Sequence, residues 1–327
     1  MSGWRAEGMR RRGLLAGALL PAARLARAEA FPARPVRILV PYGPGGSSDI
    51  VARILAQRAG ELSGQGFPVE NRGGGATVPG TQAVATAAPD GYTIGTADNA
   101  LALNPSLLAG KLPYDTERDL GFLGLAVTSP ALLLAHPGAA ARSVDEVLAE
   151  AARRPGLGLS HGGIGAPTHL AVVQLQLATG REITPIGYRG GGPQLAALVA
   201  GETPYGFAAL SSALGHVQGG RLRALAVTGA ARTPLLPEVP SMAEAGLPAV
   251  DVLGEWGFIL PAGVPATVVE RLHALLLAPA REPALRARLE SQGYSVVASG
   301  PEDYAAQVRR EIAFWRGVAE KAGIKAE

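Results

Sequence analysis

The stretch "VPYGPGGSSDIVARILAQ" (Val40–Gln57) places three glycines between the end of an apolar run and the start of a helical pattern. The apolar residues before it are typical of a buried strand, and apolar residues recur at helical spacing over 50–55. The first N–H groups of a helix have no intrahelical partner and carry partial positive charge, and glycines let a ligand approach the backbone. The stretch therefore predicts a strand, a tight turn, and a helix N-terminus open to a small anion.

The rest of the chain repeats this strand–loop–helix unit. Strand and helix patterns alternate as far as residue 227, and the last third is richer in helix. Such alternation predicts an α/β protein with a parallel sheet and crossover helices. The predicted strands are 36–40, 67–70, 92–96, 121–127, 131–135, 157–160, 183–186, 205–209, 223–227, 252–260 and 294–297. The predicted helices are 48–62, 78–87, 101–108, 144–153, 168–178, 193–200, 266–277, 283–291 and 302–321, and Ser143 with Glu146 forms a capping box for the fourth.

Two further glycine-rich loops precede helices, "SHGGIGAPTHL" (160–170) and "YRGGGP" (188–193). In open α/β sheets ligands bind beyond the carboxyl ends of the strands, where such loops lie. We therefore expect two α/β lobes whose helix N-termini face one cleft. The candidate ligand contacts are Tyr42, Gly45, Gly46, Ser47, Ser48, Asp49, Ser160, His161, Gly163, Gly165, Thr168, Tyr188 and Arg189.

Three of these side chains have a second interpretation from the residues alone. His161 is either a loop hydrogen-bonding residue or a ligand contact, and Tyr188 lies either in the cleft or in the core. Arg189 is either solvated or a carboxylate contact, since a guanidinium binds carboxylates in a two-pronged fashion.

The first thirty residues predict a signal peptide. Three arginines at 10–12 precede an apolar stretch over 14–23, and Ala28-Glu29-Ala30 matches a cleavage signature. We expect export to the periplasm with cleavage near Ala30, by either the Sec or the twin-arginine route. Met1 and Met9 both remain candidate starts.

The charge and the cysteine content exclude several classes of function and site. The formal charge is +3, but residues 1–30 carry six arginines against two glutamates, so the remainder has a charge of −1. No basic cluster remains for a nucleic acid. The absence of cysteine in an exported chain excludes disulfides and thiolate metal sites. No later stretch reaches the ~18 apolar residues of a membrane span, so we expect no stable membrane insertion, and we expect a monomer.

The chemical motifs predict no catalysis, no metal and no cofactor. The first loop lacks the lysine of a phosphate-binding loop, and the five histidines form no metal-ligand spacing. Gly158–Gly162 matches the G-x-S-x-G elbow of hydrolases, with Asp251 and His273 downstream. An elbow turns directly into a helix, whereas the glycines after Ser160 delay the helix to about Thr168. A secreted serine hydrolase with Ser160 as nucleophile stays the alternative.

Seven motifs follow one another across residues 31–327. They read "FPARPVRILVPYGPGGSSDIVARIL", "VENRGGGATVPGTQAVATAAPDGYTI", "LNPSLLAGKLPYDTERDL", "LSHGGIGAPTHLA", "RLRALAVTG", "PEVPSMAEAGLP" and "EWGFILPAGVP". Taken in this order, they resemble the Bug family, the periplasmic receptors of tripartite tricarboxylate transporters.

The resemblance implies a type II, Venus-flytrap binding protein that closes on a small carboxylate and delivers it to integral membrane transporter subunits. The loops matching 42–49 and 160–168 would hold the carboxylate through backbone groups, hydroxyls and water. The lobes would comprise 31–128 plus 253–327, and 129–252. Two chain crossings would form the hinge, the second of them between Thr228 and Phe258. A sensor subunit that presents its ligand to a receptor is a further alternative, and the ligand's identity stays open.

The chain departs from the family pattern at three positions. Family members usually carry aspartates at the positions of Pro204 and Ala208, and the second of these is expected to border the cleft. The alanine counts against an amino-acid ligand, because an acidic residue there would meet an ammonium group. Gly187 replaces the usual proline before Tyr188, which leaves the local path of that loop open.

Overall fold

The structure is a computed structural model that describes Met1 and residues 31–322. The predicted signal peptide, its cleavage position and the alternative start at Met9 lie outside the described residues. From Phe31 onward the chain forms one compact unit. Within the described residues, no helix is both long enough and apolar enough to cross a lipid bilayer.

One mixed sheet runs through the described chain in the order β2-β1-β3-β9-β4-β7-β5-β6, and β8 and β10 also pair with β4. The strands are β1 Arg37–Val40, β2 Val69–Asn71, β3 Thr93–Ala97, β4 Leu120–Ala135, β5 Leu157–His161, β6 Ile183–Gly187, β7 Tyr205–Ala209, β8 Arg223–Val227, β9 Leu253–Pro261 and β10 Ser295–Val296.

The α-helices are α1 Ser47–Ser63, α2 Val78–Ala85, α3 Ala100–Leu107, α4 Val144–Arg153, α5 Pro167–Thr179, α6 Gly191–Ala200, α7 Leu210–Gln218, α8 Ala266–Leu276, α9 Pro283–Ser291 and α10 Pro301–Ala322, with short 3₁₀ helices at Gly75–Thr77 and Ala278–Arg281. The predicted capping box is confirmed in part, since the Glu146 N–H donates to Ser143 Oγ at 3.2 Å. The Glu146 carboxylate accepts from the N–H of Arg142 instead of Ser143.

Two elements differ from the sequence-based prediction. The strands predicted at 121–127 and 131–135 are one strand of 16 residues, β4, because the Thr-Ser-Pro segment between them stays extended and pairs with β9. Helix α7 was not predicted, because it follows β7 with no turn residue between them and begins with two serines in its first turn.

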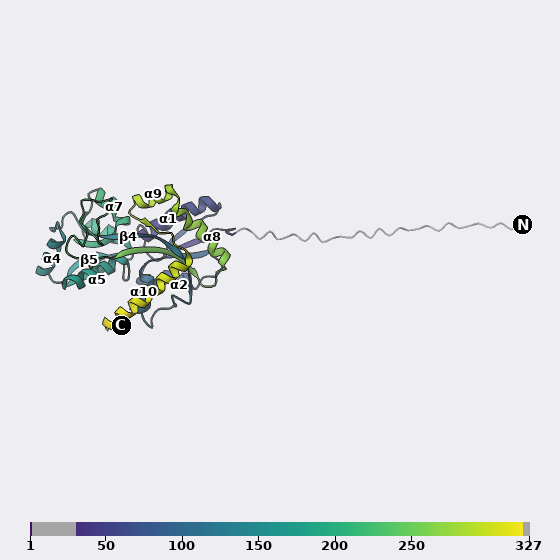
Figure 1. The fold of residues 1–327 in the computed structure, drawn as a ribbon, viewed down its shortest axis with the longest axis horizontal. Coiled ribbons are helices and arrows are strands. Elements are labelled where there is room, and N and C mark those ends of the chain that lie inside the picture. Colours follow the sequence, from purple (N-terminus) through teal and green to yellow (C-terminus); the bar gives the residue numbers. More distant parts are fainter. Residues whose placement is uncertain (2–30, 323–327) are drawn as a thin grey trace. The chain divides into compact units, whose positions relative to one another are not determined.

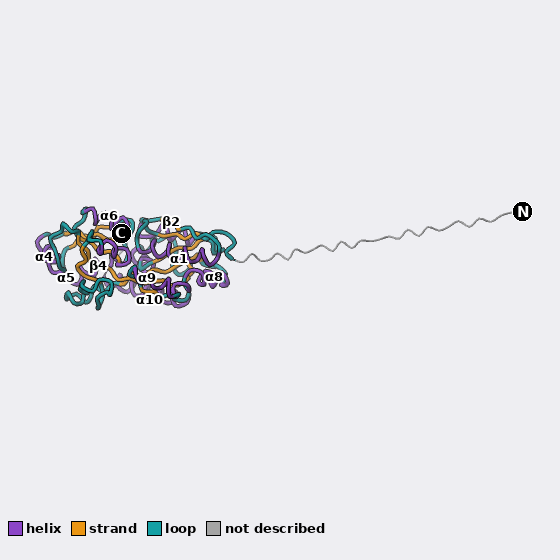
Figure 2. Tube along the Cα trace, turned by 90° about the horizontal axis from the view of Figure 1, so that it is seen from above, coloured by secondary structure: helices purple, strands orange, loops and turns teal. Residues whose placement is uncertain are grey.

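The long strand β4 joins the two halves of the sheet. Its residues 120–130 pair with β9, beside β3 and β1, and its residues 131–135 pair with β7 and β8. Figures 1 and 2 show β4 between the half that carries α1, α8 and α9 and the half that carries α4 and α5. Both β4 and β9 run antiparallel to their neighbours, so the predicted parallel sheet is correct only for β1–β3 and for β5–β7.

Apolar cores fill both halves of the molecule. Phe258 on β9 lies in the core of the first half, and Tyr205 and Phe207 on β7 lie in that of the second. The predicted lobe boundaries remain a prediction, and the first of them, at residues 128 and 129, falls inside the continuous strand β4.

A pair of carboxylates lies where β9 meets α10. The Gln307 amide donates to Glu255 at 2.5 Å and to Glu311 at 3.0 Å. Burial, and after it the neighbouring Glu311 carboxylate, raises the pKa of Glu255 to about 8 from its usual 4.5. The folded state therefore holds this proton more tightly than the unfolded state, and stability falls as the pH rises from about 4.5 to about 8.

We expect Glu255→Gln to remove this pH dependence. In the wild-type protein we expect the free energy of unfolding to fall by roughly 1–2 kcal/mol between pH 5 and pH 8.5. This fall is smaller than the pKa shift of Glu255 alone implies, because the side chain is partly exposed and solvent screens its charge. Urea unfolding at both pH values measures it, with Glu270→Gln on α8 as the exposed control. If the free energy of unfolding of Glu255→Gln falls with pH as steeply as that of the wild-type protein, other groups cause the pH dependence.

Candidate functional site

A cavity of about 40 Å³ lies where the first turns of four helices meet. Strands β1, β5 and β6 lead through short loops into α1, α5 and α6, and β7 leads directly into α7, so the fold brings these four helices to one place. The residues from these helices that line the cavity are Ser47, Ser48, Pro167, Thr168, Gly191, Gln194 and Ser212.

Within the described chain, none of these four helices has a side-chain cap at its N-terminus. Their N-cap residues are Gly46, Ala166, Gly190 and Ala209, none of which carries a hydrogen-bond acceptor in its side chain. Other helices in the described part of the chain lack such a cap too, for example α2 and α8, but they do not line this cavity. In α7 the Ser211 N–H already donates to Ser129 Oγ at 3.3 Å. The other unpaired N–H groups of these first turns, and the positive ends of the helix dipoles, favour an anion in this space.

The serine hydroxyls beside the cavity are already paired. Ser47 Oγ lies 2.7 Å from Ser211 Oγ, and Ser48 Oγ lies 2.7 Å from Thr96 Oγ1. The Tyr294 hydroxyl donates to the Ser47 carbonyl oxygen at 2.6 Å, which fixes the start of α1 from behind. The backbone N–H groups are therefore the main donors left for a ligand.

An acidic side chain, Asp98, also lines this cavity. Its Oδ2 accepts from the Tyr42 hydroxyl at 2.7 Å, and its Oδ1 accepts from the Ala100 N–H at 3.1 Å. Burial raises the pKa of Asp98 to about 6. Sequence reasoning missed this residue, although it directly follows β3, at the strand edge where the loops gather.

A second cavity, of about 200 Å³, adjoins the first, and Tyr42 and Gly162 line both. One wall is the segment 74–77, in which Ala76 and Thr77 have φ of 50° and 70°. A β-branched residue rarely adopts this left-handed conformation, and such strain concentrates at functional sites. Sequence reasoning missed this segment too, although it begins within a run of three consecutive glycines, residues 73–75.

The two halves of the molecule touch around these cavities through glycine backbone. The Gly43 N–H donates to the Arg189 carbonyl oxygen at 2.7 Å. A Cβ at Gly46 would lie 3.2 Å from the Gly191 nitrogen, and one at Gly192 would overlap the Pro44 carbonyl oxygen. The glycines of the first and third loops thus serve the approach of the two halves as well as access to the backbone.

Eight of the thirteen predicted contacts line the two cavities. The inner cavity is lined by Tyr42, Gly46, Ser47, Ser48 and Thr168, and the outer by Tyr42, Gly163, Tyr188 and Arg189.

The other five predicted contacts lie beside the cavities. Asp49 accepts hydrogen bonds from Arg53, Asn71 and the Gly45 N–H, so its carboxylate orders the turn. Burial alone would raise the pKa of Asp49, but these hydrogen bonds outweigh it and lower the pKa. Gly165 has φ of 80°, and a Cβ there would lie 3.1 Å from Ala100 Cβ.

His161 lies behind the outer cavity. Its ring is 4.6 Å from that of His169, and its Nδ1 is 3.0 Å from the Gly163 carbonyl oxygen. Burial, with a smaller effect of His169, lowers the pKa of His161 to about 4, so the ring is neutral at pH 7. Among the described residues, no group of three or more acidic or histidine side chains is placed to hold a metal ion.

Ser160 does not have the surroundings of a hydrolase nucleophile. Its side chain is fully buried, and its Oγ donates to the Tyr205 carbonyl oxygen at 3.2 Å. His273 is paired with the Ser299 carbonyl oxygen, and Asp251 with Gln174. Helix α5 begins only at Pro167, so the strand-to-helix elbow does not form at Ser160.

The family departure at Ala208 has a different meaning in the structure. Ala208 is buried among the leucines of β4, α6 and α7 and does not border the cleft, which corrects the expectation from sequence. The next residue, Ala209, lines the inner cavity.

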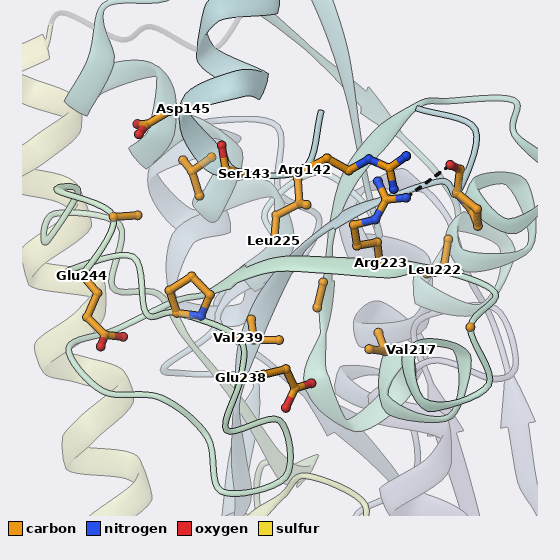
Figure 3. Close-up of a pocket in the computed structure, with 16 residues that line it drawn as sticks. Arg142, Ser143, Asp145, Val217, Leu222, Arg223, Leu225, Glu238, Val239 and Glu244 are labelled. Carbon is orange, nitrogen blue, oxygen red and sulfur yellow. Dashed lines mark hydrogen bonds between the residues drawn. The ribbon is translucent and has the colours of Figure 1, made fainter. Parts of the chain in front are cut away.

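A larger cavity, of about 640 Å³, lies elsewhere, between the start of α4, strand β8 and the segment 237–245. Figure 3 shows Arg142 and Arg223 toward one side of it and Glu238 and Glu244 toward another. None of the predicted contacts lines it, and no set of helix N-termini converges on it. Volume alone would favour this cavity, but the chemistry favours the two smaller ones.

Comparisons with known proteins give one consistent resemblance over most of the chain. Residues 51–324 match the family model described as the tripartite tricarboxylate transporter family receptor. The chain is 32% identical to Protein BugT of Bordetella pertussis over 91% of this chain and 92% of that protein.

Solved structures show the same fold. The periplasmic binding protein BugD superposes with a TM-score of 0.86 at 30% identity, over 91% of this chain and all of that one. MatC from Rhodopseudomonas palustris, with bound malate, gives 0.82 at 29% identity, over 88% of this chain and 99% of that one. R. palustris Rpa4515, with adipate, superposes with a TM-score of 0.85 at 30% identity, over 91% of this chain and all of that one. The fold is therefore that of the periplasmic binding proteins, as the sequence predicted.

Proposed function

Since this chain belongs to the tripartite tricarboxylate transporter receptor family, we propose that it binds a small carboxylate in the two adjoining cavities beside α1, α5, α6 and α7. The family is one of solute-binding proteins and not of enzymes. The observation that carries the proposal is the set of four uncapped helix N-termini around the inner cavity. MatC and Rpa4515, which hold malate and adipate, support a carboxylate as the ligand.

The carboxylate group occupies the inner cavity, and the rest of the ligand extends into the outer one. The N–H groups at the start of α1 come from one half of the molecule, and those of α5, α6 and α7 come from the other. An anion between them would be held by both halves, so binding would favour the arrangement in which the two halves touch. Outside this cavity the halves are joined by β4 and by the segment that leads into β9, where the hinge would lie.

The same family membership underlies the proposed partner and location. The closed receptor delivers its ligand to the integral membrane subunits of the transporter, and it acts as a monomer. The arginine cluster, apolar stretch and Ala28-Glu29-Ala30 signature of the first thirty residues support export with cleavage near Ala30.

A thermal-shift screen tests the proposal. Residues 31–327 are melted with di- and tricarboxylates, aromatic acids and amino acids, and Trp256, which lines the inner cavity, gives a fluorescence signal for the same titrations. A ligand at 100 times its dissociation constant stabilises by roughly 2.7 kcal/mol, which is a shift of about 4–5 °C in the melting temperature of a chain of this size. Acid amides of the same shape are the matched controls, and we expect no shift from them. Equal shifts from an acid and its amide would contradict an anion site.

A further inference from the structure

Two residues that line the inner cavity carry hydrogen-bond acceptors that a simple carboxylate, having no donor, would leave unused. One is the Asp98 carboxylate, which follows β3 in the first half of the molecule. The other is the side-chain oxygen of Gln194 on α6, in the second half. Both residues line the same space as the helix N-termini, so donors and acceptors surround one ligand.

Asp98 is only partly satisfied. Its side chain accepts one hydrogen bond at each oxygen, from Tyr42 and from Ala100, whereas a carboxylate offers about four lone-pair positions. The residue is only 7% exposed, so bulk water reaches it poorly. A ligand carboxylate placed beside it with no donor between them would be repelled.

Gln194 is held in one orientation with its oxygen free. Its Nε2 donates to the Phe207 carbonyl oxygen at 2.9 Å and to the Ser160 carbonyl oxygen at 3.2 Å. Both partners are acceptors, so the assignment of the amide nitrogen is fixed by its surroundings. Its Oε1 has no hydrogen-bond partner in the described chain, although the residue is fully buried. Buried acceptors without a donor are rare in proteins and indicate a missing water or ligand group.

A glycine on β7 makes room for this amide. A Cβ at Gly206 would overlap Ser160 Oγ and lie 3.1 Å from Gln194 Nε2. The lack of a side chain at Gly206 therefore leaves room for the Gln194 amide beside the cavity. A larger residue at position 206 would displace this amide.

We propose that the ligand is a carboxylate that also carries a hydrogen-bond donor, either a hydroxyl or an ammonium group, accepted by Asp98 and Gln194. This inference rests on the proposed function, since it concerns the same cavity. The donor lies between Asp98 and the ligand's own negative charge, which removes their repulsion. Ala208 no longer argues against an ammonium group, because it lies in the core and Asp98 supplies an acidic group in the cavity.

Three four-carbon diacids that differ at one carbon test the proposal. Succinate has no donor there, malate has a hydroxyl and aspartate has an ammonium group. We expect calorimetric titration at pH 7.5 to show that malate or aspartate binds about ten- to a hundredfold more tightly than succinate, as one charge-assisted hydrogen bond would give. The same comparison with adipate and its 2-hydroxy and 2-amino forms covers a longer ligand.

Two variants assign the preference to these side chains. Asp98→Asn keeps a hydrogen-bond acceptor but loses the negative charge. It should therefore weaken the binding of aspartate at least tenfold and the binding of malate by less. Gln194→Met, whose side chain is close in shape to that of glutamine, should weaken the binding of both malate and aspartate. Glu238→Gln, in the separate larger cavity, is the control, and the melting temperature without ligand reports on folding.

Three outcomes would overturn the inference. The unsubstituted acids could bind as tightly as the substituted ones in the wild-type protein. In Asp98→Asn the preference for substituted acids could fall for the sole reason that succinate binds more tightly. Asp98 would then repel a plain acid without accepting a hydrogen bond from the ligand. The preference could also survive in both variants. If no acid of either length binds, the carboxylate proposal fails and this inference fails with it.

Discussion

Gly192→Ala should weaken carboxylate binding about a hundredfold and should cost the ligand-free protein less, because the two halves can separate when no anion holds them together. Gly192 lies in the first turn of α6 and its φ is not in the left-handed region, so alanine is compatible with the local backbone. Its Cβ would overlap the Pro44 carbonyl oxygen, which belongs to the opposite half of the molecule. Closure would then require a backbone shift that costs up to ~3 kcal/mol, equivalent to about a hundredfold in affinity.

Gly215→Ala is the matched control for this prediction. Gly215 is also helical, on α7, and a Cβ there would meet nothing within 4 Å. Alanine at 215 should keep the affinity and leave the melting temperature equal or slightly higher. If Gly192→Ala binds as tightly as Gly215→Ala, then the closed contact between α6 and the first loop is not part of binding.

Trp256→Ala should destabilise the fold by about 3–5 kcal/mol, the cost of truncating a large buried aromatic side chain. Trp256 is 4% exposed on β9 and forms an edge-to-face pair with Tyr294, with ring centroids 6.0 Å apart. Tyr294 in turn donates to the Ser47 carbonyl oxygen. The same substitution therefore loosens the start of α1 as well as the wall of the inner cavity, and it should weaken carboxylate binding.

Urea unfolding and calorimetric titration measure the two effects. Trp256→Phe keeps the aromatic contact and should lose less than half as much stability. Tyr294→Phe isolates the hydrogen bond to Ser47 and should cost about 1–2 kcal/mol. A loss below 1 kcal/mol in Trp256→Ala would contradict the assigned role of this side chain.

Most of the fold, and the meeting of the glycine-rich loops beside two cavities, could be predicted because both depend on local pattern. Glycines between an apolar run and a helical pattern mark the loops before α1, α5 and α6, and the carboxyl ends of strands place those loops together. Eight of the thirteen predicted contacts accordingly line the two cavities. Their role in binding remains a prediction.

What the sequence did not reveal depends on tertiary contacts. Asp98 reads as an ordinary residue after a strand, and only the fold brings it against Tyr42 beside the cavity. Asp49 was predicted as a ligand contact, whereas its carboxylate accepts from Arg53 and Asn71, which come from a helix turn and a separate strand. The continuity of β4 follows from its pairing with β9, some 130 residues later in the chain, and no local pattern encodes that pairing.

The most direct test of the account is a crystal structure of residues 31–327 with the tightest acid of the screen. We predict that one carboxylate lies within hydrogen-bond distance of N–H groups at the start of α1 and of at least one of α5, α6 and α7, in the cavity lined by Tyr42 and Trp256. A ligand seated instead between Arg142 and Arg223 in the 640 Å³ cavity, with the inner cavity empty, would contradict it.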